Sequence, residues 1–148
     1  MAGSNLQAAL PLPGQGSVKA LKIDGVAALT HPVAGTRVNL RRGRIFRPGY
    51  ELTVGASARV TLALSNGTIL FVDSAAAIGF RQLLQAPFDP ALGDFDSLPH
   101  DPSPSNTLFD LERGMVAGRV KFLNRGSSFE VQTAVGSIFI DNSIFEIW

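Results

Sequence analysis

Cysteine is absent from this chain of 148 residues, and histidine occurs only twice. Without cysteine, disulfides, thiolate nucleophiles and cysteine-ligated metal sites are excluded, and the fold is independent of the redox state of its compartment. A catalytic triad or a histidine-based metal site would depend on His31 or His100, and both stand beside prolines, in segments typical of turns and loops. No nucleophile elbow or phosphate-binding glycine loop occurs either. We therefore expect a protein that is not an enzyme and takes no cofactor.

Net charge is small, and long apolar runs are absent. Lys and Arg number 13 and Asp and Glu 12, which gives a formal charge of +1, too little for a general attraction to nucleic acid or to a membrane surface. No stretch approaches the roughly 20 apolar residues that a membrane-spanning helix needs. Hydrophobic residues nevertheless make up 45% of the chain, which is enough apolar surface for one folded domain.

Glycine, by contrast, is frequent and divides the chain into short segments, which suits strands better than helices. The alternation of Val60, Leu62 and Leu64, followed by Asn66-Gly67 and a second apolar run, predicts a β-hairpin with a type I′ turn. Further strands are predicted at 18–23, 26–29, 37–40, 108–111, 116–122, 129–133, 137–140 and 144–148. The sequence thus predicts an all-β fold of short strands with glycine turns.

The chain divides into a short arm and one domain. Residues 1–17 are rich in proline and glycine and are predicted to form an N-terminal arm or linker. Residues 1–4 are typical of an expression remnant, and a native leader is expected to have been removed. The domain is predicted over 18–148, with one long proline-rich loop at 86–106. A loop of that length in a compact domain is usually functional or mobile.

The proline-rich loop carries four aspartates: Asp89, Asp94, Asp96 and Asp101. Several carboxylates on a flexible loop can gather around a calcium ion, although their spacing fits no EF-hand. The alternative is a solvated acidic loop. The sequence leaves both interpretations open.

The densest positive run consists of Arg37, Arg41, Arg42, Arg44 and Arg47. On a strand, Arg37 and Arg41 would share one face, while Val38 and Leu40 would fill the core. Such a face could contact phosphates, anionic glycans or an acidic protein surface, or it is a solvated face that discourages edge pairing. No aromatic residues interleave the run, so nucleic acid is not an expected partner.

Three isolated aromatic residues complete the candidate interaction surface: Phe88, Phe95 and Trp148. Together with Tyr50 they raise a further alternative, a hydrolase or polysaccharide-binding domain. No catalytic cluster accompanies them, so we expect contacts with a protein partner or with a second copy of the chain.

Taken in order, several segments resemble the FecR domain, the extracytoplasmic module of bacterial FecR-family proteins. The matching segments are Leu40–Gly43, Tyr50–Gly55, Ala58–Thr68, Leu108–Gly118, Ser128–Thr133 and Val135–Gly136. Their order and spacing carry the resemblance, because no single motif is diagnostic. The insert at Pro87–Gly93 and Pro102–Ser105 is similar to a variant in exported FecR-like proteins of Verrucomicrobia-type bacteria. The chain departs from the family at Thr133-Ala134, where the family has Thr-Pro, and at Asp141–Ser143, where it has Arg-Gly-Thr.

The resemblance implies an all-β fold between a β-sandwich and a β-solenoid, and a location outside the cytoplasm, in the periplasm or at the cell surface. In classical relatives an anti-sigma segment and a membrane helix precede this domain, which receives a signal from an outer-membrane transporter; neither segment is recognisable here. We expect a non-enzymatic protein-interaction domain that senses or scaffolds in the envelope. The alternative is a self-assembling envelope or filament subunit, in which residues 1–17 or 144–148 add a strand to a neighbour.

Overall fold

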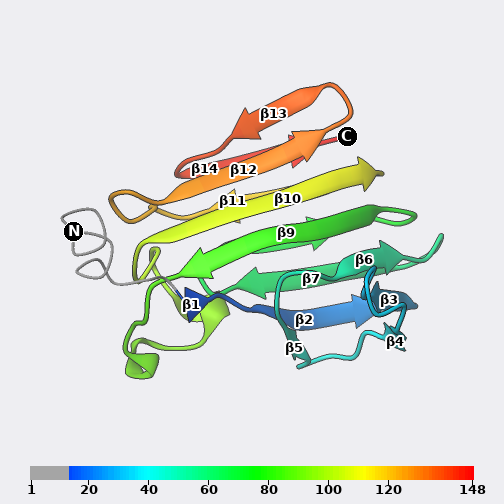
Figure 1. Ribbon diagram of the computed structural model, residues 1–148, viewed down its shortest axis with the longest axis horizontal. Coiled ribbons are helices and arrows are strands. Elements are labelled where there is room, and N and C mark those ends of the chain that lie inside the picture. The colour runs from blue at the N-terminus through cyan, green and yellow to red at the C-terminus, as the bar shows by residue number, and fades with distance from the viewer. Residues whose placement is uncertain (1–13) are drawn as a thin grey trace, which may run out of the picture.

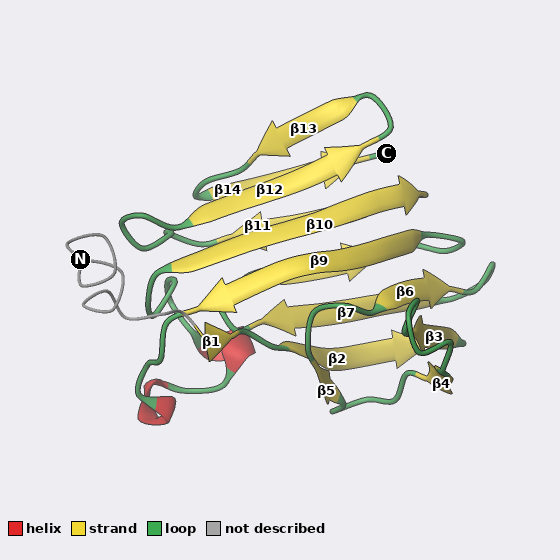
Figure 2. Ribbon diagram, in the orientation of Figure 1, coloured by secondary structure: helices red, strands yellow, loops and turns green. Residues whose placement is uncertain are grey.

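Two β-sheets packed face to face make up the protein in the computed structural model, which describes residues 14–148 apart from the side chain of Pro90 (Figures 1 and 2). Sheet A follows the spatial order β13–β12–β10–β9–β6–β3–β4, and β1 also pairs with β9. Its strands are β1 (Gly14–Gln15), β3 (Ala27–Thr30), β4 (Arg37–Asn39), β6 (Glu51–Val54), β9 (Ala77–Gln85), β10 (Ser105–Arg113), β12 (Ser128–Thr133) and β13 (Gly136–Phe139).

Sheet B lies behind sheet A and follows the order β14–β11–β8–β7–β2–β5. Its strands are β2 (Val18–Asp24), β5 (Ile45–Phe46), β7 (Arg59–Leu64), β8 (Ile69–Val72), β11 (Val116–Val120) and β14 (Ser143–Ile147). The outermost strands of the two sheets therefore lie at the same two edges of the sandwich: β4 and β5 at one edge, and β13 and β14 at the other (Figure 1).

The all-β prediction is confirmed, and the architecture is a sandwich, not a solenoid. Neighbouring strands are antiparallel except β10 and β12, which are parallel because the chain crosses to sheet B through β11 between them. Helical structure in the described chain is confined to two 3₁₀ turns, η1 (Pro90–Leu92) and η2 (Phe95–Ser97) (Figure 2). No helix among these residues is long and apolar enough to cross a bilayer.

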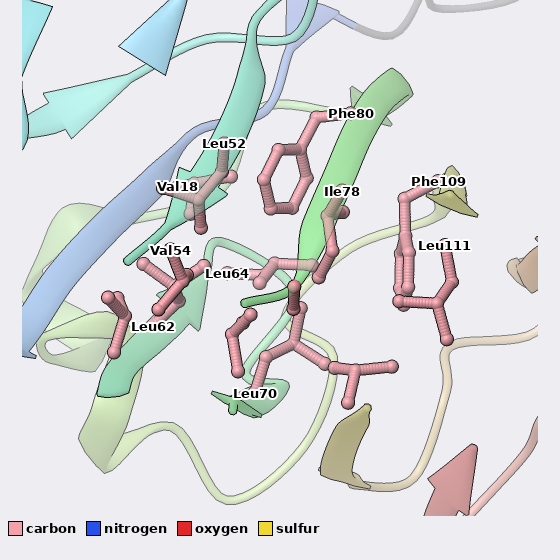
Figure 3. Close-up of a cluster of buried hydrophobic side chains, with 14 of the residues drawn as sticks. Val18, Leu52, Val54, Leu62, Leu64, Leu70, Ile78, Phe80, Phe109 and Leu111 are labelled. Atoms are coloured by element: carbon pink, nitrogen blue, oxygen red, sulfur yellow. The ribbon is translucent and has the colours of Figure 1, made fainter. Parts of the chain in front are cut away.

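The core lies between the sheets and is built from alternate positions of their strands (Figure 3). Its buried side chains include Val18, Leu52, Val54, Leu62, Leu64, Leu70, Ile78, Phe80, Phe109 and Leu111. Because strand side chains alternate between faces, this pattern places the remaining positions on the two outer surfaces. Each fully buried side chain of this size stabilises the fold by about 1.5–3 kcal/mol.

A row of phenylalanines runs through this core from one edge of the sandwich to the other. Successive ring centroids are separated by 5.5, 6.1, 5.7 and 6.3 Å along the series Phe46, Phe80, Phe109, Phe129 and Phe145. Such separations suit tilted and edge-to-face aromatic packing. The row ties the outermost strands β5 and β14 to the centre of the fold.

The predicted hairpin is present as β7 and β8, but its turn is not type I′. Gly67 has a φ of 87°, whereas Asn66 does not adopt a positive φ. The Gly67 amide donates to the Leu64 carbonyl at 2.9 Å, so a three-residue loop with glycine in the left-handed position replaces the two-residue turn. Asn66 instead bonds the Thr68 amide and the Thr107 hydroxyl, each at 3.0 Å, which docks the turn against β10.

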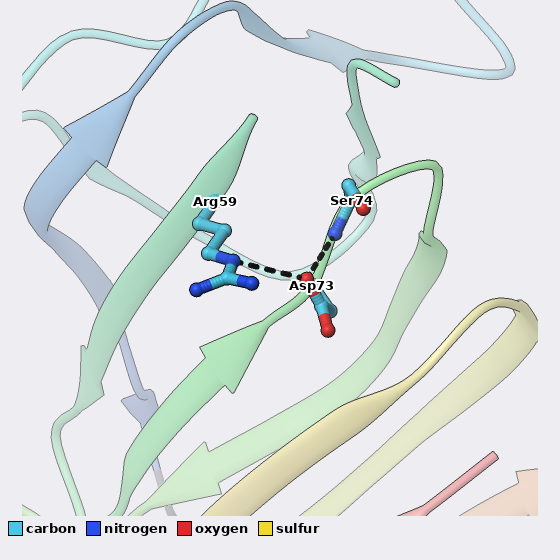
Figure 4. A network of polar contacts seen from close by, with 3 residues as sticks. All are labelled: Arg59, Asp73 and Ser74. Carbon is cyan, nitrogen blue, oxygen red and sulfur yellow. Dashed lines mark hydrogen bonds and ion pairs between the residues drawn. The ribbon is translucent and has the colours of Figure 1, made fainter. Parts of the chain in front are cut away.

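At the other end of this hairpin, Asp73 follows β8 and organises the connection to β9 (Figure 4). Its Oδ1 accepts from the Ser74 amide at 2.7 Å and from Arg59 Nε at 3.2 Å. The first bond shapes the turn, and the second ties it to the start of β7. Because Arg59 is exposed, the ion pair contributes at most about 1 kcal/mol.

The longest strands include β9, which the apolar pattern did not predict. From Ile78 onward its buried residues are Ile78, Phe80, Leu83 and Gln85, so the spacing between buried residues changes from two to three in the middle. The register against β10 shifts at the same place, where a β-bulge adds one residue. A bulge interrupts the period of two, and the sequence signal of the strand is lost with it. The short strands β5 and β6 were also not among the predicted strands.

Residues 14–17 of the predicted arm lie against the domain. Gly14 and Gln15 pair with Gln85 and Leu84, and the Gly16 amide donates to the Leu83 carbonyl at 2.7 Å. A Cβ at Gly16 would lie 2.5 Å from Leu83 Cγ, so only glycine fits at this approach. Residues 1–13, which hold most of the proposed strand-donating arm, lie outside the described residues.

Candidate functional site

The five predicted arginines gather at one edge of the sandwich, which we call the arginine edge. Arg37 begins β4, Arg44 and Arg47 flank β5, and Arg41 and Arg42 lie in the turn between these two strands. All five are exposed, and none of them forms an ion pair with any of the residues that the structure describes. Like charges that face each other across two paired strands repel and destabilise the pair. This edge therefore resists pairing with an identical edge.

The predicted core positions of this segment are only half right. Leu40 is buried, as expected, but Val38 is 38% exposed although it faces the same interior. The reason is the position of β4, which has a neighbour on one side only. A residue on an outermost strand loses cover from the missing strand, and the alternation pattern does not reveal which strand is outermost.

The opposite edge, β13 and β14, carries large exposed apolar side chains, and we call it the open edge. Its members are Val135, Ile138, Phe139, Ile144 and Trp148. Phe139 is 72% exposed, and Ile144 and Trp148 are each 81% exposed. No lysine, arginine or proline occurs after residue 127, so the lysines and prolines that often block unwanted strand pairing are missing here.

Only Trp148 of the open edge was among the predicted site residues. The sequence nevertheless contained a signal for the others, because residues 131–140 form an uncharged run with Ile144 close behind it. The nearest charges are acidic and lie at Glu130, Asp141 and Glu146. The open edge is thus apolar with an acidic surround, and the arginine edge is its electrostatic opposite.

The proline-rich loop is docked and not free, because Asp101 is buried with 1% exposure. Its Oδ2 accepts from the hydroxyls of Ser105 and Ser127 at 2.9 and 2.6 Å and from the Asn124 amide at 3.0 Å, and its Oδ1 accepts from Gln85 Nε2 at 3.1 Å. The solvated-loop interpretation is therefore wrong for Asp101. Asp101 differs in this respect from the other three aspartates, which are exposed.

Calcium binding by these aspartates finds no support in the geometry. Between residues 14 and 148 no group of three or more His, Asp or Glu side chains is placed to hold an ion. The Asp101 oxygens already have protein donors, so this carboxylate acts as a structural centre that joins the loop to β9, β10 and the segment before β12.

A lysine also ties the loop to sheet B. Lys121 Nζ donates to the carbonyl oxygens of Leu98 and Asp96. Burial lowers the pKa of this ammonium, with a smaller contribution from Arg119. The loop residue Leu98 is itself buried, so the loop covers the end of the sandwich beside the Gly67 turn.

Phe88 and Phe95 come together beside the arginine edge. Both are half-buried and line a depression of about 280 Å³ together with Lys19, Ile45 and Asp94. Ile45 belongs to β5, so two of the three predicted aromatics belong to the arginine edge, and the third, Trp148, follows β14. The predicted surface is therefore divided between the two edges and does not form one patch.

A separate cleft of about 570 Å³ opens on the outer face of sheet A around His31 and Tyr50. Their rings meet edge to face at 5.2 Å, and His31 Nδ1 accepts from the Ala34 amide at 3.1 Å, which confirms the predicted turn. Glu51 and Glu112 also line it. Burial, followed by the charge of Glu51 and a hydrogen bond to it, raises the pKa of Glu112. No sequence motif links these two glutamates, because β9 alone brings β6 and β10 together.

The fold and its edges define the protein as a two-sheet β-sandwich with one charged edge and one apolar edge. Comparison with protein families, with curated proteins and with solved structures finds no match. The resemblance to the FecR domain therefore depends on the sequence segments given above.

Proposed function

We propose that the protein is a non-enzymatic interaction domain of the FecR type that presents the open edge to an extended segment of a protein partner. The observation that carries this proposal is the contrast between the two edges. One is protected by five arginines that form no ion pair within residues 14–148, and the other exposes apolar side chains next to main-chain groups without a neighbouring strand in the described chain. Extended segments add to such edges through main-chain hydrogen bonds, which supply affinity, and contacts of alternate side chains supply specificity.

The open edge has main-chain groups available for such a partner. The Ile140 amide donates to the Phe129 carbonyl at 2.9 Å, so Ile140 and Ile138 direct their main-chain groups toward β12. By the alternation of antiparallel strands, Ser137 and Phe139 direct theirs away from the sheet. A partner strand would pair with these two residues and cover the ring of Phe139.

The FecR resemblance adds a location outside the cytoplasm to the proposal and a role in envelope sensing or scaffolding. Fractionation of cells that produce the protein from its natural gene checks this part on its own. Recovery with cytoplasmic markers would contradict the location and leave the binding proposal unaffected.

Photo-crosslinking tests the binding proposal. Phe139 and, in a matched control, Phe71 are each replaced by benzoylphenylalanine; Phe71 is 50% exposed but lies on the central strand β8. We expect one dominant adduct from position 139, identified by mass spectrometry, and none from position 71. Equal adduct yields at the two positions would contradict the proposal.

A further inference from the structure

We infer that the partner at the open edge is a second copy of this chain, which docks its arginine edge there, so that copies join head to tail. This inference names the occupant of the site and therefore depends on the proposed function. It differs from strand donation by a terminal arm, because both partners are strands already formed in the sandwich.

Strand directions allow this docking in both sheets. In sheet A, five of the six steps from β13 to β4 are antiparallel and one is parallel. In sheet B, all five steps from β14 to β5 are antiparallel. An odd number of reversals makes the outermost strands of each sheet run in opposite directions. A second copy in the same orientation therefore places β4 antiparallel to β13 and β5 antiparallel to β14.

The main-chain pattern of sheet A also matches. The His31 amide donates to the Thr36 carbonyl and the Leu40 amide to the Ala27 carbonyl, so β4 directs alternate residues toward β3. Arg37 and Asn39 are the residues left with outward main-chain groups. On β13 these residues are Ser137 and Phe139, as shown above.

Side-chain directions agree with this pairing. Pairing of Arg37 with Phe139 and of Asn39 with Ser137 places Val38 opposite Ile138. Val38 and Ile138 pair with the buried Leu29 and Val131 in their own sheets, so both face the interior. A one-residue mismatch would have turned one of them to the outer surface. The new pair would cover both apolar side chains and set the Arg37 guanidinium beside the Phe139 ring.

Sheet B gives the same result independently. The Arg44 carbonyl accepts from the Ala20 amide at 2.9 Å, so Ile45 directs its main-chain groups away from β2. The Asp73 amide donates to the Met115 carbonyl at 3.1 Å. By alternation along β11, this leaves Ile144 and Glu146 of β14 with outward main-chain groups. Ile45 and Ile144 are both exposed and lie on the outer surface, so they are matched in direction and in chemistry.

Charge complementarity specifies the heterologous contact. Residues 37–47 contain five arginines and no acidic residue, whereas residues 128–148 contain Glu130, Asp141 and Glu146 and no lysine or arginine. Two arginine edges repel each other, and two open edges share the same acidic sign. Only the contact between unlike edges brings opposite charges together. A heterologous contact of this kind forms rings or open filaments and not a closed two-fold dimer.

Sedimentation velocity of the 148-residue chain tests the inference. We expect the weight-average sedimentation coefficient to rise as the protein concentration is increased to about 1 mM. Added salt should lower the coefficient, because salt screens the exposed charges. Two charge variants are the decisive reagents: Arg44→Glu with Arg47→Glu, and Asp141→Lys with Glu146→Lys. Each variant alone is expected to associate at least about tenfold more weakly than the wild type.

Mixing the two charge variants should restore association. In the mixture, the unaltered open edge of the first variant meets the unaltered arginine edge of the second, and the new glutamates at 44 and 47 face the new lysines at 141 and 146. Val33→Lys, at an exposed loop position that is 91% accessible, is the control and should leave association unchanged. Circular dichroism checks that every variant is folded. Phe139→Lys, which places a charge on the open edge, is a second variant that should weaken association.

A wild type that stays monomeric at all concentrations overturns the inference, as do charge variants that associate like the wild type or that fail to recover on mixing. Crosslinking from position 139 separates the two proposals. An adduct to residues 37–47 of a second copy supports both, and an adduct to another protein supports the proposed function alone. Equal adduct yields from positions 139 and 71 would contradict both proposals.

Discussion

Replacement of Asp101 tests whether the proline-rich loop is held to the sandwich by one buried carboxylate. In Asp101→Asn, the amide nitrogen is best placed at the Oδ1 position, where only Gln85 Nε2 points, so that the three donors at Oδ2 keep an oxygen acceptor. The new side-chain amide nitrogen at position 101 then faces Gln85 Nε2, and both groups are hydrogen-bond donors. A buried donor left without a partner costs about 1–3 kcal/mol, and this is the expected loss of unfolding free energy.

Asp101→Ala removes both oxygens and is expected to cost more. The serine hydroxyls can rotate to other acceptors, but the Asn124 main-chain amide cannot, and Gln85 Nε2 keeps only its bonds to Ser103. The loss is expected to exceed that of Asp101→Asn, because every hydrogen bond to the charged acceptor disappears, and each such bond contributes about 1.5–3 kcal/mol. Asp96→Asn is the control: Asp96 is exposed, and surface substitutions usually stay within about 0.5 kcal/mol.

Urea unfolding followed by circular dichroism measures these differences, and hydrogen exchange over residues 86–104 reports whether the loop is released. The expected order of stability is wild type and Asp96→Asn, then Asp101→Asn, then Asp101→Ala. If both Asp101 variants lie within about 0.5 kcal/mol of the wild type, the carboxylate does not hold the loop and the reasoning is refuted.

Two further predictions concern backbone strain and pH. Gly43 and Gly114 both have a φ of 84°, but a Cβ at Gly114 would lie 2.6 Å from Ala76 Cα, whereas Gly43 faces open space. Gly43→Ala should therefore cost about 1–2 kcal/mol, and Gly114→Ala about 1–3 kcal/mol more; equal losses in urea unfolding would exclude the clash. The pKa of Glu112 is raised above 4.5 by burial and by Glu51, so its contribution to stability is present below pH 4.5 and is lost as the pH rises through the raised pKa. The thermal midpoint of Glu112→Gln, relative to wild type, should increase from pH 4.5 toward neutrality, and a flat difference would argue against the glutamate pair.

Most of the strands were predictable from the sequence, and each exception has an identifiable structural cause. The β7–β8 hairpin follows from apolar alternation interrupted by a glycine turn, which are both local properties. The β9 strand was missed because a bulge changes the spacing of its buried residues. The turn at Asn66 was misassigned because the Asn66 side chain bonds Thr107 on β10, a partner far away in the sequence.

The candidate site was predictable only in part. The arginine run was visible, but its position at an edge was not, and the uncharged run 131–140 did not by itself show that its strands are outermost. Asp101 carries the same charge as its three neighbours in the loop, yet it alone is buried. Burial of this kind depends on which donors the rest of the chain brings to it.

The sequence by itself determined the all-β class and the absence of cysteine chemistry, because composition, period and turn residues act over a few positions. The tertiary structure decided which strands are outermost, and with this the arginine edge, the open edge and their opposite chemistry. The order of strands in a sheet is set by packing between distant segments. Local residue patterns are the same for a central strand and for an edge strand, so they carry no information about that order.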